Sequence, residues 1–176
     1  MTVNLASPAG KRDHTRGTPG GGLTIVAYGD YECPQSARVC RDLRRLEQYA
    51  DGRLIVVFRN FPLTQIRPHA LAAALAAEAA GRQGQFWEMH DMLFEHQRSL
   101  EPEDLIAYAQ LLRLDTERFV TDMTSDVAAA RVREDFVYGI KSGVNGTPTL
   151  YINGRRYDGV QTYEALTRQA DHVLAR

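Results

Sequence analysis

Cys33 lies directly before Pro34, at the start of a segment with helical periodicity. Proline is favoured at the first position of a helix because its missing N–H would have no partner there. A cysteine at this place faces unsatisfied N–H groups and the positive end of the helix dipole, which lowers the thiol pKa and populates the nucleophilic thiolate. Asp30 and Glu32 act in the opposite direction, since nearby carboxylates disfavour another negative charge. We expect a reactive thiol at Cys33 rather than a small buried hydrophobic residue.

The second cysteine, Cys40, is predicted to be structural. Seven positions on one helix, at a rise of ~1.5 Å each, separate the α-carbons of Cys33 and Cys40 by ~10 Å, whereas a disulfide needs roughly 4.4–6.8 Å. Cys40 also falls on the apolar side of the predicted helix, where free cysteines are commonly core residues. Two cysteines are too few for a disulfide framework or a multi-cysteine metal site.

The histidines of the middle segment give no comparable signal. His90 and His96 lie near three carboxylates, those of Glu88, Asp91 and Glu95. A spacing of six positions points the two histidines to different faces of a helix, so this segment is interpreted as a solvated face rather than a metal site. No phosphate-binding loop and no serine-hydrolase motif occurs in the sequence. We expect no metal and no bound cofactor.

The hydrophobic pattern predicts an α/β scaffold around Cys33. Residues 23–28 and 54–58 are short, apolar and β-branched, which is typical of buried strands. Between them, residues 34–49 carry apolar side chains at three- and four-residue spacing, which predicts an amphipathic helix with its arginines outward. Strand, helix and strand in this order predict a βαβ unit.

Helical patterns then fill residues 68–141, and sheet patterns return afterwards. Asp115 and Ser125 are predicted to be N-caps of two of these helices. Asn153-Gly154 between two short strands, 149–152 and 155–157, is a strong hairpin signal, because a type I′ turn needs positive φ at both central positions. The other expected helices cover residues 70–80, 85–96, 102–112 and 162–174, and residues 1–22, rich in Gly, Pro, Ser and Thr, are expected to form a mobile arm with a short edge strand near residues 12–16.

Several segments together resemble the DsbA-like branch of the thioredoxin superfamily. They read YGDYECPQS at 28–36, FRNFPL at 58–63, QFWEMHD at 85–91 and GTPT at 146–149. The likeness covers most of the chain from residue 13 onward and is strongest to small cytoplasmic bacterial members, including those fused to sodium/proton antiporters. It implies an α/β thioredoxin fold with a large all-helical insertion. The thioredoxin domain would comprise residues 23–62 and 144–176, and the insertion residues 63–143.

The resemblance also implies roles for individual residues. Cys33 corresponds to the attacking cysteine of the Cys-Pro-x-Cys motif, and Pro148 to the cis-proline packed opposite it. The backbone of Thr147 would then offer an edge to which an extended substrate segment can pair. Pro34 and Gln35 lie within the motif and are expected to contact the substrate.

Ser36 replaces the second cysteine of the family motif. A second thiolate normally resolves the mixed disulfide formed by the first, and a serine cannot attack sulfur. Ser36 is instead expected to donate a hydrogen bond to the Cys33 thiolate, worth about 1.5–3 kcal/mol if well aligned. The sequence therefore predicts a thiol-disulfide oxidoreductase with one nucleophilic cysteine, acting on a disulfide-containing or glutathionylated protein or a small thiol, with glutathione as resolving co-substrate.

Two alternatives remain open at this point. The chain could be a redox-inactive thioredoxin-fold domain that binds a peptide or a transporter partner in the groove beside Pro148. It could also be a relative of glutathione transferases or isomerases, in which Ser36 would hold the thiolate of glutathione.

Length and charge exclude other classes. The chain has 176 residues, which fits one globular domain, and 21 basic residues are balanced by 22 acidic ones, so no net field favours a nucleic-acid partner. The longest strongly apolar run, residues 70–77, is far shorter than the ~20 residues that a membrane helix needs. Residues 1–22 lack the apolar stretch of a secretory signal, so we expect a cytoplasmic location. The oligomeric state is left open.

Overall fold

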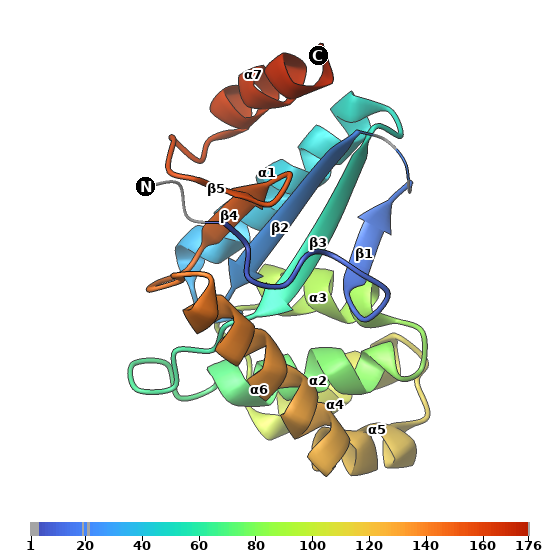
Figure 1. The fold of residues 1–176 in the computed structure, drawn as a ribbon. Coiled ribbons are helices and arrows are strands. Elements are labelled where there is room, and N and C mark those ends of the chain that lie inside the picture. The colour runs from blue at the N-terminus through green and yellow to red at the C-terminus, as the bar shows by residue number, and fades with distance from the viewer. Residues whose placement is uncertain (1–3, 19, 21, 176) are drawn as a thin grey trace.

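The computed structural model describes residues 4–18, 20 and 22–175 and contains one five-stranded sheet in the order β1-β3-β2-β4-β5 (Figure 1). The two central strands, β2 and β3, are parallel, while every other pair is antiparallel. The parallel pair is joined by α1, so the predicted βαβ unit is confirmed. The strands are β1 (His14–Gly17), β2 (Leu23–Gly29), β3 (Leu54–Asn60), β4 (Thr149–Ile152) and β5 (Arg155–Tyr157).

Five of the seven helices in the described residues lie between β3 and β4 in the chain, where the sequence predicted an all-helical segment. In Figure 1, helices α2 to α5 gather below the carboxyl ends of β2 and β3, and α6 runs from this group towards the sheet. The helices are α1 (Pro34–Ala50), α2 (Ala70–Gly81), α3 (Phe86–Glu95), α4 (Pro102–Leu111), α5 (Thr116–Met123), α6 (Asp126–Lys141) and α7 (Tyr163–Leu174).

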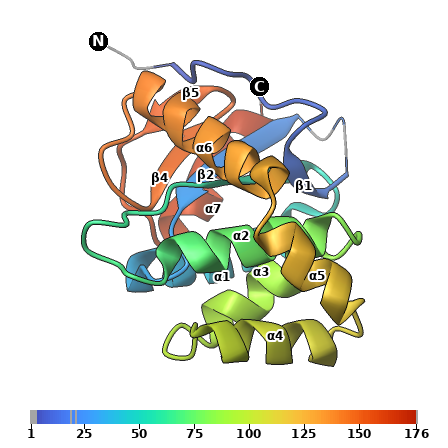
Figure 2. The same ribbon diagram turned by 90° about the horizontal axis from the view of Figure 1, so that it is seen from below.

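The central strands are mostly apolar because both faces of the sheet are buried; the polar Arg59 and Asn60 lie at the carboxyl end of β3. On β2, Ile25 and Ala27 contribute to the core that includes residues of α1 and α7, whereas Val26 and Tyr28 point to the opposite face. That second face packs against Phe136 of α6. Figure 2 shows α6 and the N-terminal segment on one side of the sheet and α1 on the other. The chain leaves the carboxyl end of β2 between these two layers.

The local signals in the sequence are confirmed. Asn153 and Gly154 both have positive φ, 45° and 79°, as a type I′ hairpin requires. The side chains of Asp115 and Ser125 each accept a hydrogen bond from the backbone N–H three residues further on, at 3.0 and 3.2 Å. These caps define the starts of α5 and α6.

The predicted N-terminal arm is packed against the body over much of its length. The edge strand expected there is β1, which pairs with β3. Asp13 forms a buried ion pair with Arg59 of β3 at 2.8 Å, and the indole N–H of Trp87 donates to the backbone oxygen of Thr15 at 2.8 Å. The composition of the arm did not reveal these tertiary contacts. Residues 1–3, 19 and 21 of the arm, and residue 176, lie outside the described part of the chain.

The interpretation of His90 as part of a solvated face is wrong. His90 is only 3% exposed, and its Nδ1 lies 3.1 Å from the hydroxyl oxygen of Tyr31. Its ring also packs edge-on against Phe58 and Phe94. Burial holds the pKa of His90 well below its usual value. His90 is therefore a neutral core residue, although Glu88, Glu95 and His96 are exposed as expected.

Candidate functional site

Cys33 occupies the N-cap of α1 and is separated from the carboxyl end of β2 by the short turn 30–32. Its backbone is extended, with φ −85° and ψ 115°, and Pro34 is the first helical residue. The N–H of Cys33 donates to the backbone oxygen of Asp30 at 3.0 Å, which closes a turn, and the Cys33 oxygen accepts the first helical hydrogen bond from Ala37 at 3.1 Å. The thiol therefore sits at the positive end of the helix dipole, as the sequence predicted.

The predicted site residues gather around the Cys33 sulfur. Its Sγ lies 3.3 Å from the backbone oxygen of Thr147 and 3.3 Å from Oε1 of Gln35, and both oxygens can accept a hydrogen bond from the thiol. The Thr147–Pro148 peptide bond is cis, as the resemblance implies. Pro148 is half-buried, Gln35 is exposed and Ser36 is fully buried.

The pKa of the Cys33 thiol is lowered from its ordinary value. Burial raises this pKa, but the nearby hydroxyl and backbone N–H of Ser36, the side chain of Thr147 and the positive charge of Arg67 favour the thiolate and outweigh burial. Ser36 is held for this role because its oxygen accepts the N–H of Asp30 at 3.3 Å, which leaves the hydroxyl proton for the sulfur. The serine that replaces the second cysteine can thus stabilise the negative charge of the first.

The two carboxylates next to Cys33 are bound by other groups, so the opposition expected from them is weakened. Asp30 is buried and accepts the N–H groups of Glu32 and Leu63, each at 2.8 Å. Burial raises the pKa of Asp30 although these donors and Arg67, at 3.5 Å, act to lower it. Glu32 accepts from both the backbone N–H and the ring Nδ1 of His69, at 2.7 and 2.8 Å.

Sequence reasoning missed three residues of this site: Arg67, His69 and Gln97. Gln97 donates its side-chain amide to the backbone oxygens of Tyr31 and Cys33, at 2.6 and 2.9 Å. These residues come from the segment after β3 and the loop after α3, and each lies far from Cys33 in the chain. No motif marks Arg67 or Gln97, His69 was expected only as a structural histidine at a helix start, and the fold brings all three to Cys33.

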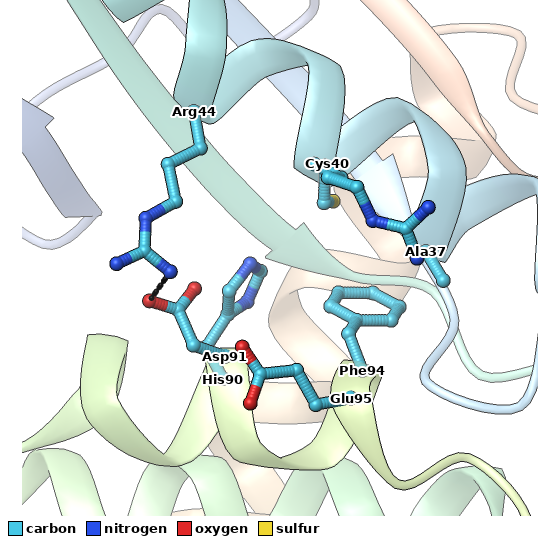
Figure 3. Close-up of a pocket in the computed structure, with 8 residues that line it drawn as sticks. Ala37, Cys40, Arg44, His90, Asp91, Phe94 and Glu95 are labelled. Carbon is cyan, nitrogen blue, oxygen red and sulfur yellow. Dashed lines mark ion pairs between the residues drawn. The ribbon is translucent and has the colours of Figure 1, made fainter. Parts of the chain in front are cut away.

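Cys40 behaves as the structural residue that the sequence predicted. It is half-buried, packs against the main core, and burial raises the pKa of its thiol strongly. Figure 3 shows Cys40 in a small recess in which Arg44 is paired with Asp91, at 3.1 Å. Both cysteines are free thiols. The recess is lined by Ala37, Cys40, Arg41, Arg44, His90, Asp91, Phe94 and Glu95.

Two absences hold for the residues that the structure describes. Within them, no helix is both long and apolar enough to cross a membrane. Across the same residues, no three His, Cys, Asp or Glu side chains are grouped so that they could hold a metal ion.

Comparison with known proteins gives the family. Residues 10–172 match the family model described as thioredoxin. The chain belongs to this thioredoxin family. A thioredoxin-like oxidoreductase from Silicibacter pomeroyi has the same fold, with a TM-score of 0.83 and 26% identity over 95% of both chains. BdbD from Bacillus subtilis, in its oxidised form, shares the fold with a TM-score of 0.86 and 23% identity over 99% of both chains. The chain therefore has the fold of DsbA-like thiol-disulfide oxidoreductases.

Curated relatives with higher identity are much longer than this chain. A protein named Na(+)/H(+) antiporter NhaA 1 from Salinispora arenicola is 46% identical over 167 residues, which is 93% of this chain but 25% of the relative. NhaA 1 from Mycolicibacterium gilvum is 41% identical over 90% of this chain and 26% of its own length. The chain thus spans about a quarter of the length of these relatives.

Proposed function

We propose that the chain is a thiol-disulfide oxidoreductase that works through Cys33 alone, with glutathione or a similar small thiol as the resolving partner. The observation that carries this proposal is a thiol at the N-terminus of α1, with Ser36 three positions further on, at the place where the family motif has its second cysteine. Such a thiol can form a mixed disulfide but has no neighbouring thiol to resolve it. The need for an abundant small thiol agrees with a reducing, cytoplasmic location, which we propose with it.

The proposed reaction has two exchange steps. In the first, the Cys33 thiolate attacks the glutathione sulfur of a glutathionylated protein; a bond forms between Cys33 and glutathione, and the substrate leaves as a thiolate that takes up a proton. In the second, the thiolate of another glutathione attacks the adduct, which releases oxidised glutathione and restores the Cys33 thiolate. Two glutathione sulfurs supply the two electrons that reduce the substrate disulfide.

Incubation with oxidised glutathione tests the second step in reverse, because the Cys33 thiolate then attacks oxidised glutathione and releases one reduced glutathione. Mass spectrometry of the peptides is expected to show one glutathione adduct, on Cys33 and not on Cys40, and reduced glutathione is expected to remove it. The Cys33→Ser variant, which is nearly isosteric, serves as the control and should also fail to release glutathione from a glutathionylated peptide. A Cys33 that stays unmodified at neutral pH would refute the proposal. Conjugation of an aryl halide without any reduction of mixed disulfides would favour the transferase alternative.

A redox-inactive binding domain is the second candidate, because Cys33 is only 1% exposed and the chain matches parts of proteins named antiporters. In this function an extended segment of a partner, such as a transporter loop, would pair with the backbone at Thr147. Binding that survives Cys33→Ser but is lost on Thr147→Pro, which alters that edge, would select this candidate.

A further inference from the structure

Gln97 lies in the loop between α3 and α4 and reaches the turn that carries Cys33. Its amide nitrogen donates to the backbone oxygen of Tyr31 at 2.6 Å and to that of Cys33 at 2.9 Å. These carbonyl groups belong to residues on either side of Glu32, so one side chain fixes the turn across its middle residue. Tyr31 and Cys33 are both buried, and buried carbonyl groups need hydrogen-bond partners. A residue 64 positions away thus determines the backbone next to the thiol.

The loop between α3 and α4 also contacts the turn indirectly, through the side chain of His69. The ring of His69 lies between the carboxylates of Glu32 and Glu101, with Nδ1 at 2.8 Å from one and Nε2 at 3.0 Å from the other. Glu101 is the N-cap of α4 and ends the loop that contains Gln97. The helical layer therefore holds the side chain of the turn through His69 and its backbone through Gln97.

The backbone of the turn decides what the Cys33 sulfur contacts. From its extended N-cap conformation at the start of α1, the Cys33 sulfur lies 3.3 Å from both the backbone oxygen of Thr147 and Oε1 of Gln35, and a rotation of the preceding peptide would move the sulfur away from these contacts. Hydrogen bonds to a charged group depend strongly on distance and angle. We propose that Gln97 is a positioning residue: its two hydrogen bonds hold the turn so that Cys33 is reactive. This rests on the proposed function, in which Cys33 is the nucleophile.

The experiment compares substitutions of Gln97 and Gln83, two glutamines whose side chains form hydrogen bonds to the backbone of another loop. Gln97→Met keeps the length of the side chain and removes both donors. Gln83→Met is the matched control, because Gln83 also joins two loops, through the backbone N–H and oxygen of Asp115 at 2.9 and 3.0 Å, and lies on the loop between α2 and α3 rather than on the turn. The rate of iodoacetamide alkylation is measured against pH, and peptide mass spectrometry separates Cys33 from Cys40.

The expected result is a shift of the alkylation midpoint of Cys33 to higher pH in Gln97→Met, by about one unit. Below the midpoint such a shift makes the reaction about tenfold slower. Gln83→Met is expected to lose some thermal stability and to keep the wild-type midpoint. A loss of stability alone would not move the midpoint, so the pH profile separates positioning from a merely structural role.

An unchanged midpoint in folded Gln97→Met, or an equal shift in Gln83→Met, would overturn the proposal. If circular dichroism shows that Gln97→Met does not fold, Gln97→Asn replaces it, since its shorter amide cannot span both carbonyl groups; a wild-type midpoint there overturns the proposal equally. Alkylation needs no disulfide substrate. A shifted midpoint in a protein that never exchanges glutathione would therefore support the role of Gln97 while refuting the proposed function.

Discussion

At the scale of single residues, the residue at position 36 determines whether Cys33 can be oxidised to an internal disulfide. Ser36 stabilises a thiolate at Cys33 but cannot form a bond with it. Three positions along a helix correspond to a rise of ~4.5 Å, which is compatible with the α-carbon separation of a disulfide, unlike the seven positions between Cys33 and Cys40. The site geometry thus lacks only the second sulfur to become a dithiol centre.

Ser36→Cys is therefore expected to convert the proposed single-thiol site into a dithiol site. After oxidation with oxidised glutathione, mass spectrometry should show an internal disulfide between positions 33 and 36 in place of the glutathione adduct of the wild type. Reduction of a model disulfide should then proceed with a dithiol reductant and no glutathione. Ser36→Ala, which adds no thiol, is the control and should keep the adduct. A stable adduct in Ser36→Cys would contradict this geometry.

The sequence revealed only those site residues that are close to Cys33 or lie in a segment that carries the family resemblance. A proline after the cysteine predicts the N-cap position from local rules, and the structure has Cys33 there. Gln97 lies in a polar loop where a glutamine carries no signal, and its role depends on how α3 packs near the turn. A sequence pattern that extends over a few residues cannot predict tertiary contacts of this kind.

At the scale of elements, periodicity and capping predicted nearly every helix and strand, while one surface was assigned wrongly. The expected solvated face of α3 contains buried His90. A signal was present in the spacing, because Phe86, Met89, His90, Leu93 and Phe94 fall on one helix face and all five are buried. The polarity of histidine favours a solvated position, but the hydroxyl of Tyr31, which is 59 positions away, satisfies the ring inside the core.

The close approach of α6 to the sheet depends on Gly139. A β-carbon at this position would lie 2.7 Å from Cδ2 of Phe61 and 3.1 Å from Cε1 of Tyr28, closer than packed atoms allow. Alanine favours a helix by about 1 kcal/mol over glycine, but overpacking a core costs about 1–3 kcal/mol. We expect Gly139→Ala to lower the free energy of unfolding by about 1 kcal/mol, as measured by urea denaturation.

Gly146→Ala is the control for this substitution, since a β-carbon there meets no atom within 4 Å and its φ is not positive. Its free energy of unfolding is expected to stay within about 0.5 kcal/mol of the wild type. Equal or greater stability of Gly139→Ala would mean that α6 can move away from the sheet without loss.

At the scale of the whole molecule, buried charges connect the helical layer to the sheet. Asp135 of α6 accepts the backbone N–H of Asn60 at the end of β3 at 3.0 Å and pairs with Arg131 one turn earlier. The side-chain amide of Asn60 donates to Glu78 of α2 at 2.8 Å, and Glu78 in turn bonds to His14 of β1 at 2.9 Å. One chain of polar contacts thus runs from α6 through β3 and α2 to the edge strand.

Asp135, the carboxylate at the α6 end of this series of polar contacts, makes the free energy of unfolding depend on pH. Burial raises the pKa of Asp135 to about 6, although Arg131 and the N–H of Asn60 act to lower it. An unfolded chain would have a pKa near the ordinary value of about 3.9. Between these two values the folded state binds the proton more tightly, so this group makes the free energy of unfolding fall as pH rises from about 4 to about 6.

Asp135→Asn removes this titration while the amide oxygen can still accept the N–H of Asn60. Relative to the wild type, the variant is therefore expected to gain stability as pH rises through this window, with the difference levelling off above it. Urea denaturation at several pH values measures the difference, and Asp126→Asn shows what removal of an exposed carboxylate from the same helix does. A difference between Asp135→Asn and the wild type that falls with pH would mean that the ion pair with Arg131 outweighs burial, and that the polar chain between α6 and the sheet stabilises the fold in its charged form.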